Sequence, residues 1–492
     1  MNYRSISYIL GRIYIIVGAL MLLPLSVCFY YNFHGFEETS YLSFIIPIII
    51  LEALGIVLTI NKPEKISIYA KEGFVICGLG WITMSAFGAI PFVISGYIPN
   101  FIDAFFETVS GFTTTGSSIL LEVESIPKSI LFWRSFTVWI GGMGILSFMI
   151  AIIPKAKGNS MFIMKAEVPG PTTSKVVSKI STSARILYVI YFFITIFEIV
   201  ILYVGTKITG DNMRFFDCVV NSFATAGTGG FTVLNKSILG YNSAFAEWVC
   251  TVFMFLFGVN FNLYYLFLTR KFSQALKDEE LRAYVIINLT AVVLIIINIH
   301  SMYDSFSVAV RDAFFSVNTA MSTTGFCTAN FDIWPTFSKV ILLLVMCIGG
   351  CAGSTAGGIK VLRFELLFKQ MLCDLRRTVR PSTVLNVRLN EKSVDTKIIR
   401  SVKSYLIVYL VIFSASLLII SIDNFDFDTS FSAVVACFNN IGPGLGLVGP
   451  VGNYSQFSDL SKLVLIFDML AGRLELFPIL LLFSPNTWRK TK

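Results

Sequence analysis

The fold is decided by Thr113-Thr114-Thr115-Gly116 and by three further stretches like it, each a few small residues with glycine at or near the end: Gly227-Thr228-Gly229-Gly230, Ser322-Thr323-Thr324-Gly325 and Asn440-Ile441-Gly442-Pro443. We take Gly116, Gly229, Gly325 and Gly442 as equivalent, which separates them by 113, 96 and 117 residues. This period suits one domain-sized hairpin repeated four times. Phenylalanine stands eleven residues before the glycine in three copies, whereas the second copy has Cys218 there. Four copies that each end in a glycine turn predict four walls around one axis.

The composition indicates a membrane protein. Of the 492 residues, 55% are hydrophobic and 14% are charged, and the mean hydropathy is +0.75, which is typical of a membrane-embedded chain. A helix needs about 20 apolar residues to cross a bilayer. Ten apolar runs are candidates: 8–31, 41–60, 73–95, 130–153, 185–206, 244–269, 282–300, 337–370, 401–421 and 461–483. We therefore expect an all-α polytopic membrane protein with ten transmembrane helices.

The glycine stretches fall between the third and fourth, fifth and sixth, seventh and eighth, and ninth and tenth runs. Each predicted repeat is thus a spanning helix, a re-entrant half-helix, an extended stretch and a second spanning helix. Non-helical backbone at membrane depth needs cover from protein or a water-filled path, so the four stretches should line one pseudo-fourfold pore. The first run is too long, and has no cleavage site, for a signal peptide. The predicted organisation is a leading two-helix segment, 1–70, then pore repeats 71–154, 185–280, 281–375 and 398–492, with cytoplasmic loops 155–184 and 376–397.

The distribution of charge predicts the orientation. Lys and Arg gather at both ends of the chain and in the segments 61–72, 154–185, 270–282 and 359–400. By the positive-inside rule both termini are cytoplasmic and the glycine stretches open outward. The net charge of +8 is therefore explained by topology and not by nucleic-acid binding. The basic segment 360–400 is either a solvated loop that fixes topology or a docking surface for a cytoplasmic partner or anionic membrane lipid.

The glycine stretches have the chemistry of a site for a dehydrated alkali cation. Rings of backbone carbonyls replace the lost water without a formal charge that would trap the ion, and glycine lets the backbone turn successive carbonyls inward. Threonine hydroxyls could add oxygens or hold the strand from behind. The half-helices end where the stretches begin, so their negative dipole ends point at the cation path. The predicted ligands of this alkali cation are Thr114, Thr115, Gly116, Gly227, Thr228, Gly229, Thr323, Thr324, Gly325, Asn440, Ile441 and Gly442.

The eighth apolar run is interrupted by five glycines between Ile348 and Lys360, namely Gly349, Gly350, Gly353, Gly357 and Gly358. A glycine inside a helix costs roughly 1 kcal/mol relative to alanine, so we expect the chain to unwind here. The segment is interpreted either as a flexible gate under the glycine stretches or as close helix packing through small residues. Arg473 lies inside the tenth run between Asp468 and Glu475. It is expected either to face the cavity near this gate or to form an ion pair with one of those acids.

These motifs together resemble the Trk/Ktr/HKT superfamily of potassium transporters, and the extra leading pair of helices resembles its TrkH branch. The resemblance covers nearly the whole chain. It depends on the motifs Ser110-Gly111-Phe112-Thr113-Thr114-Thr115-Gly116, Gly141-Gly142-Met143-Gly144-Ile145, Ala166-Glu167-Val168-Pro169-Gly170-Pro171, Gly353-Ser354-Thr355-Ala356-Gly357-Gly358-Ile359-Lys360 and Asn439-Asn440-Ile441-Gly442-Pro443-Gly444-Leu445-Gly446.

The resemblance implies a potassium-uptake subunit of the inner membrane, a homodimer gated by a cytoplasmic nucleotide-binding ring protein of the TrkA type. It implies a selectivity filter at Gly116, Gly229, Gly325 and Gly442, and a gate at residues 349–358. Arg473 would be a positive charge near that gate. Potassium would be the transported ion, and no organic cofactor is implied. Because sodium-preferring relatives carry serine at the first filter position, the glycine there implies a preference for potassium. Ile441, where the family has threonine, makes the four stretches chemically unequal.

The sequence argues against an enzyme and leaves a secondary carrier as the alternative function. The cysteines and the histidines, His34 and His300, have no metal-ligand spacing, and no catalytic cluster lies in the apolar runs, so an enzyme is not expected. A secondary carrier that couples potassium or another solute to protons or sodium is the alternative, although carriers usually show two, often inverted, repeats. Residues 444–449 match a dinucleotide fingerprint by letter but lack its βαβ context. Control by a nucleotide would therefore come from a separate chain.

Overall fold

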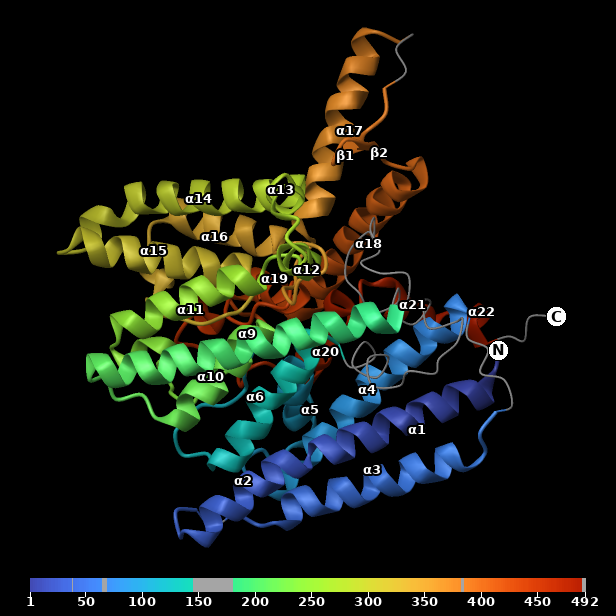
Figure 1. Ribbon diagram of the computed structural model, residues 1–492, viewed down its shortest axis with the longest axis vertical. Coiled ribbons are helices and arrows are strands. Elements are labelled where there is room, and N and C mark those ends of the chain that lie inside the picture. Colours follow the sequence, from blue (N-terminus) through green and yellow to red (C-terminus); the bar gives the residue numbers. More distant parts are fainter. Residues whose placement is uncertain (38, 64–68, 145–179, 382–384, 489–492) are drawn as a thin grey trace.

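The computed structural model describes residues 1–37, 39–63, 69–144, 180–381 and 385–488, and within them the chain is mostly helical. Most of the predicted loop 155–184, with the motif 166–171, lies outside the described residues. So does the end of the apolar run 130–153. The two described ends of the chain lie at the same end of the molecule (Figure 1), where the Tyr3 hydroxyl donates to the carbonyl of Trp488 at 2.9 Å.

The leading segment is a pair of apolar helical arms. The first arm is α1 (Tyr3–Leu20) continued by α2 (Leu22–Phe33), and the second is α3 (Leu42–Ile60). Helices α1 and α3 run side by side (Figure 1) and approach through two glycines. A Cβ atom on Gly11 would lie 2.9 Å from the carbonyl oxygen of Gly55, and one on Gly55 would lie 2.9 Å from that of Gly11. Small residues thus permit close backbone contact, as is common between membrane helices.

The rest of the chain repeats one order of elements four times: a long helix, a shorter helix, an extended stretch and a further helix. The long helices are α4 (Ala70–Ile94), α9 (Ile180–Thr209), α14 (Glu279–Ile299) and α18 (Thr396–Ile420). The shorter ones, called half-helices here, are α5 (Phe101–Phe112), α10 (Phe215–Gly227), α15 (Phe306–Met321) and α19 (Phe427–Phe438). The further helices begin with α6 (Lys128–Gly142), α11 (Ala244–Phe257), α16 (Thr336–Ile348) and α20 (Asp459–Arg473).

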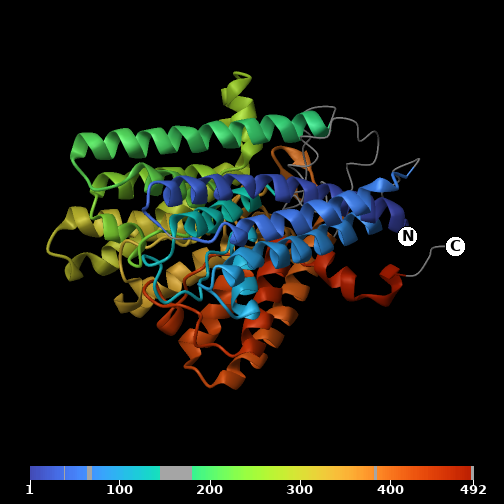
Figure 2. The same ribbon diagram turned by 90° about the horizontal axis from the view of Figure 1, so that it is seen from below.

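The remaining elements connect or extend these repeats. They are α12 (Phe261–Leu268), α13 (Phe272–Leu276), α17 (Val361–Val379), α21 (Phe477–Phe483), α22 (Pro485–Trp488), the strands β1 (Arg388–Leu389) and β2 (Lys392–Ser393), and the 3-10 turns Ser237–Tyr241, His300–Met302, Phe331–Ile333, Ser421–Asp423 and Gly446–Val448. The strands form an antiparallel hairpin in which Arg388 pairs with Ser393. Helix α17 extends beyond the bundle (Figure 1), and Figure 2 shows α9 and the fourth repeat on opposite sides of the molecule.

Ten transmembrane helices were predicted, the eighth of them interrupted, and the described residues contain six helices long and apolar enough to cross a membrane. The pair α11 and α12, bent by 91° at a short break, makes a seventh if the two helices are counted as one span. The predicted run 337–370 divides into α16 and α17, and the run 461–483 divides into α20 and α21. The prediction that the eighth run unwinds is confirmed, because no helix covers residues 349–360. Helices α11, α16 and α20 are thus each followed by a break and a second helix, which was expected only for the eighth run.

The half-helices are too short to span a bilayer, at 12 to 16 residues against the roughly 20 required. They are buried along most of their length inside the bundle. Asn100 caps the first by accepting from the amide of Ile102, and Asp426 caps the fourth by accepting from that of Thr429. Each half-helix then leads directly into a glycine stretch.

Candidate functional site

The four glycine stretches converge and form a closed ring. A Cβ atom added to Gly116 would meet the carbonyl oxygen of Gly229 in the next repeat. The same relation continues around the molecule, always at less than 3.0 Å: Gly230 to Thr324, Gly325 to Ile441, and Gly442 back to Thr115. We call Gly116, Gly230, Gly325 and Gly442, with the four carbonyls that face them, the glycine ring. A side chain at any of these glycines would occupy the space of a neighbouring carbonyl.

All four stretches have the same backbone conformation. The φ angle is positive at Thr114, Thr228, Thr323 and Asn440, between 56° and 58°, and positive again at each ring glycine two residues later. Between these two positions an amide donates to the carbonyl five residues earlier, at 2.8–2.9 Å, in each of the pairs Thr115–Ser110, Gly229–Ala224, Thr324–Thr319 and Ile441–Ala436. Left-handed residues with such bonds are a common way to end a helix. The carbonyl ends of four half-helix dipoles thus meet at the ring.

This geometry corrects the register of two stretches. Gly229 was predicted as the second anchor, but the residue with the conformation of Gly116 is Gly230. Gly229 instead occupies the position of Thr115, Thr324 and Ile441. The fourth stretch likewise begins at Asn439, not at Asn440. The sequence could not distinguish two adjacent glycines, because only the sign of φ separates them.

The side chains behind the ring differ between repeats. The hydroxyls of Thr113 and Thr115 bond each other at 2.8 Å, and those of Ser322 and Thr324 do so at 2.7 Å. The second repeat has Gly227 and Gly229 at these positions and has no such pair. In the first and third repeats the paired hydroxyls thus support each other beside the glycine stretch.

The fourth repeat is held by links to other segments. Asn440 donates to Thr115 Oγ1 at 3.0 Å and to the carbonyl of Met469 at 2.9 Å. The hydroxyls of Tyr454 and Ser117 both donate to the carbonyl of Gly442. The buried Thr114 hydroxyl, by contrast, has no hydrogen-bond partner among the described residues.

Residues 349–360, here called the glycine loop, lie against the ring. The amide of Gly357 donates to Thr323 Oγ1 at 2.6 Å, and the amide of Gly358 donates to the carbonyl of Asn439 at 3.0 Å. On the other side, the amide of Cys351 donates to the carbonyl of Gly258 at 2.9 Å, in the break between α11 and α12. The loop therefore crosses from the third and fourth repeats to the second.

Arg473, at the end of α20, bonds to carbonyls of this region. It donates to Thr355 of the glycine loop at 2.8 Å, and to Gly141 and Gly142 at the end of α6 at 2.6 Å each. The two acids considered as its ion-pair partners have other contacts, since Asp468 accepts from Ser416 and Glu475 pairs with Arg363. The buried guanidinium thus links the loop to the first and fourth repeats.

A second set of contacts at the loop was not foreseen from the sequence. The carboxylate of Glu280, in the first turn of α14, accepts from the amide of Ala352 at 2.5 Å. Asn390, in the turn of the β1–β2 hairpin, accepts from the amide of Glu279 and donates to Asp278, both at 2.9 Å. The hairpin and the glycine loop therefore hold the same turn of α14. The available signal was an acid at the start of an apolar run.

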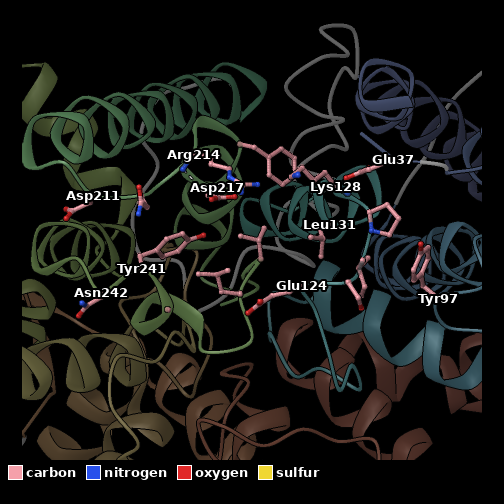
Figure 3. Close-up of a pocket in the computed structure, with 18 of the residues that line it drawn as sticks. Glu37, Tyr97, Glu124, Lys128, Leu131, Asp211, Arg214, Asp217, Tyr241 and Asn242 are labelled. Carbon is pink, nitrogen blue, oxygen red and sulfur yellow. Dashed lines mark hydrogen bonds between the residues drawn. The ribbon is translucent and has the colours of Figure 1, made fainter. Parts of the chain in front are cut away.

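A cavity with a volume of about 860 Å³ lies apart from the ring. Figure 3 shows charged side chains around it, with Asp211, Arg214 and Asp217 on one side and Glu37 and Lys128 on the other. Burial raises the pKa of Glu37, although a hydrogen bond from the amide of Lys128 partly opposes this. No group of three or more His, Cys, Asp or Glu residues that could hold a metal occurs in the described part of the chain.

Comparison with known proteins gives consistent relatives. The family model described as "TrkH: Cation transport protein" matches residues 41–490. The chain is 35% identical over 500 residues to the Trk system potassium uptake protein TrkH of Salmonella typhimurium, covering all of both chains. It is 32% identical over 493 residues to the Trk system potassium uptake protein TrkG of Escherichia coli, covering 99% of each. The crystal structure of the potassium transporter TrkH from Vibrio parahaemolyticus is similar with a TM-score of 0.86 and 32% identity, covering 99% of this chain and 100% of that one.

Proposed function

The chain belongs to the TrkH family of potassium uptake transporters of the inner membrane, and we propose that potassium enters the cell through its glycine ring. The observation that carries this proposal is the closed cycle of contacts from Gly116 through Gly230 and Gly325 to Gly442. Only a shared centre lets four stretches from one chain each face the carbonyl of the next. Such a carbonyl ring selects among monovalent cations by replacing their water.

The proposed ligands are the main-chain oxygens of the four stretches. They comprise the predicted residues Thr114, Thr115, Gly116, Gly227, Thr228, Gly229, Thr323, Thr324, Gly325, Asn440, Ile441 and Gly442, with Gly230 added by its conformation. Four half-helix ends contribute partial negative charge without a fixed carboxylate. The free hydroxyl of Thr114 supplies one further oxygen. Potassium is then the transported ion, and the mechanism uses no organic cofactor.

The glycine loop is the proposed gate. Its support is that Gly357 and Gly358 bond directly to the third and fourth stretches, and we take this side of the ring to be the cytoplasmic one. Gly349, Gly350 and Gly353 give the remaining loop the freedom to rearrange. Arg473 holds the loop at Thr355 and adds positive charge where a cation would emerge. Opening requires these bonds to break together.

The cytoplasmic partner is proposed to act through the β1–β2 hairpin. The hairpin and the glycine loop share the first turn of α14, through Asn390 on one side and Glu280 on the other. Lys369 on α17 also pairs with Glu279 in this turn. A nucleotide-binding ring protein of the TrkA type, docked on the basic segment 376–397 of a homodimer with cytoplasmic termini, would thereby reach the gate.

Proton-coupled transport is the second candidate, favoured by two buried acids. Glu198 on α9 and Asp468 on α20 are fully buried and form no ion pair within the described ranges. An acid buried without a cationic partner holds a proton in place of a charge, and such groups carry protons in coupled transporters.

Uptake in a host without its own potassium transporters tests the proposal. Expression with the ring partner should restore growth at low potassium and produce rubidium uptake. Purified protein in planar bilayers then separates the two candidates: the reversal potential should follow the potassium gradient and ignore a proton gradient. A shift with the proton gradient would favour the coupled carrier, and failure of growth and flux together would overturn potassium uptake.

A further inference from the structure

Two buried charges stand behind the glycine ring and have no part in the function proposed so far. Glu107 on α5 is 1% exposed and Arg134 on α6 is 4% exposed, and Arg134 Nε lies 2.6 Å from Glu107 Oε1. Removing two charges from water is costly, and a well-packed apolar pair is often as stable. Stability alone is therefore a weak reason for this pair, and its remaining contacts indicate a more specific role.

Those contacts go to the segments that directly follow the ring glycines, here called the ring exits: Ser118 and Ile119 in the first repeat, and Phe231 and Thr232 in the second. Glu107 Oε1 accepts from Ser118 Oγ, and Oε2 accepts from the amide of Ile119, both at 3.0 Å. These residues follow Gly116 by two and three positions. Arg134 Nη1 donates to the carbonyl of Thr232 at 3.2 Å, and its guanidinium lies 3.6 Å from the centre of the Phe231 ring. The ion pair thus joins the first stretch to the second.

The carboxylate is specific to the first repeat. Nine residues before the ring glycine the four repeats have Glu107, Asn221, Ser316 and Ala433. Contacts that join the other neighbouring repeats beyond the ring include neutral main-chain bonds, from Leu239 to Cys327 and from Tyr454 to Ser118. Within the described part of the chain, the boundary between the first and second repeats has a buried ion pair that contacts both exits.

The second stretch is also the one with the least internal support. It has glycine at 227, 229 and 230 and lacks the hydroxyl pair found behind the first and third stretches. Glycine-rich backbone has the largest conformational freedom to lose on ordering. The contacts of Arg134 with Phe231 and Thr232 restrict that freedom, in a stretch whose own glycines supply no supporting side chain.

We propose that the Glu107–Arg134 pair is a selectivity-determining positioning element, which fixes the carbonyls of Thr115 and Gly229 at a spacing suited to potassium. The inference rests on the proposed function, namely that the ring is the ion path. Neither side chain contacts the ion. When the Glu107–Arg134 pair is weakened, the first and second stretches can move apart or together, so that the ring also accommodates sodium.

The test measures the potassium-to-sodium permeability ratio of the purified full chain in planar bilayers, from the reversal potential under bi-ionic conditions. Glu107→Gln keeps the shape but removes the charge, and Arg134→Lys keeps the charge but removes the planar fork. Each should lower the ratio by about tenfold, the factor for one hydrogen bond to a charged group. Asp103→Asn is the matched control, because Asp103 lies on the same half-helix and pairs with Lys462 at 2.6 Å away from the ring exits.

The melting temperature of each variant is recorded to separate positioning from general stability. The proposal predicts that Glu107→Gln and Arg134→Lys lose selectivity at melting temperatures close to that of Asp103→Asn, which stays selective. Glu107→Asp, which keeps the charge, should recover part of the ratio. Unchanged selectivity in both main variants, or an equal loss in Asp103→Asn, would overturn the proposal. A wild type without potassium-selective flux would instead refute the proposed function itself.

Discussion

Replacing Arg473 by alanine should increase potassium flux by releasing the glycine loop. Of the three carbonyls that the guanidinium contacts, Thr355 belongs to the loop, while Gly141 and Gly142 belong to α6 and hold the side chain in place. The closed loop therefore loses one hydrogen bond from a charged donor, which is worth about 1.5–3 kcal/mol. This shifts the ratio of open to closed gate by roughly 10- to 150-fold, and removing the positive charge lowers the barrier to cations in the same direction.

The assay is rubidium uptake into proteoliposomes that contain the purified chain without its partner. Arg473→Lys is the matched variant, since it keeps the charge but cannot bridge two segments as a planar fork does, and its flux should be intermediate. The potassium-to-sodium permeability ratio should stay unchanged in both variants, because neither alters the ring. Wild-type flux in Arg473→Ala would show that the guanidinium does not hold the loop closed, and increased flux with lost selectivity would show that the ring had changed instead.

Two further predictions concern the loop and the leading helices. Thr323→Val removes the acceptor for the amide of Gly357 and should raise rubidium flux by at least about fivefold, since an unpaired buried amide costs about 1–3 kcal/mol. Thr319→Val is the control, because that buried hydroxyl has no partner among the described residues. Equal flux in the two variants would contradict the role of the bond between Gly357 and Thr323. Gly55→Leu should separate α1 from α3 and lower the free energy of unfolding, measured by thermal denaturation, by about 1–3 kcal/mol, while selectivity stays intact. Gly80→Ala is the control and should be tolerated, because the nearest atom to its added carbon lies at 3.6 Å. A stable Gly55→Leu would be evidence against the close packing of α1 and α3.

The sequence was enough to predict the repeats and the unwound eighth run, because both depend on local composition. Glycine at Gly116, Gly325 and Gly442 marks positions that require a positive φ, and such a requirement leaves its mark in the residue type. In the second repeat the same reasoning selected Gly229, since an adjacent glycine offers no local evidence about which residue takes the left-handed conformation.

The breaks in the helices and the contacts of the loop could not be predicted, because they depend on residues far apart in the chain. In the break after Phe257, the carbonyl of Gly258 accepts a hydrogen bond from the amide of Cys351. The glycine loop is also held by Glu280, which lies 72 residues before its partner Ala352. The segment after α20 turns through Glu475 and Leu476, both with positive φ, although neither residue type favours it. Apolar composition therefore predicted continuous spans over 244–269 and 461–483, where the structure has divided helices.

The most direct test of the glycine ring is the bi-ionic reversal potential of Gly325→Ala compared with Gly96→Ala in planar bilayers. The two glycines have similar φ angles, +87° and +79°, so the backbone strain of alanine is matched. At Gly325 the added carbon meets the carbonyl of Ile441, whereas at Gly96 nothing lies within 4 Å. We expect potassium selectivity in the wild type and in Gly96→Ala, and its loss in Gly325→Ala. Potassium selectivity retained in a conducting Gly325→Ala would contradict this expectation.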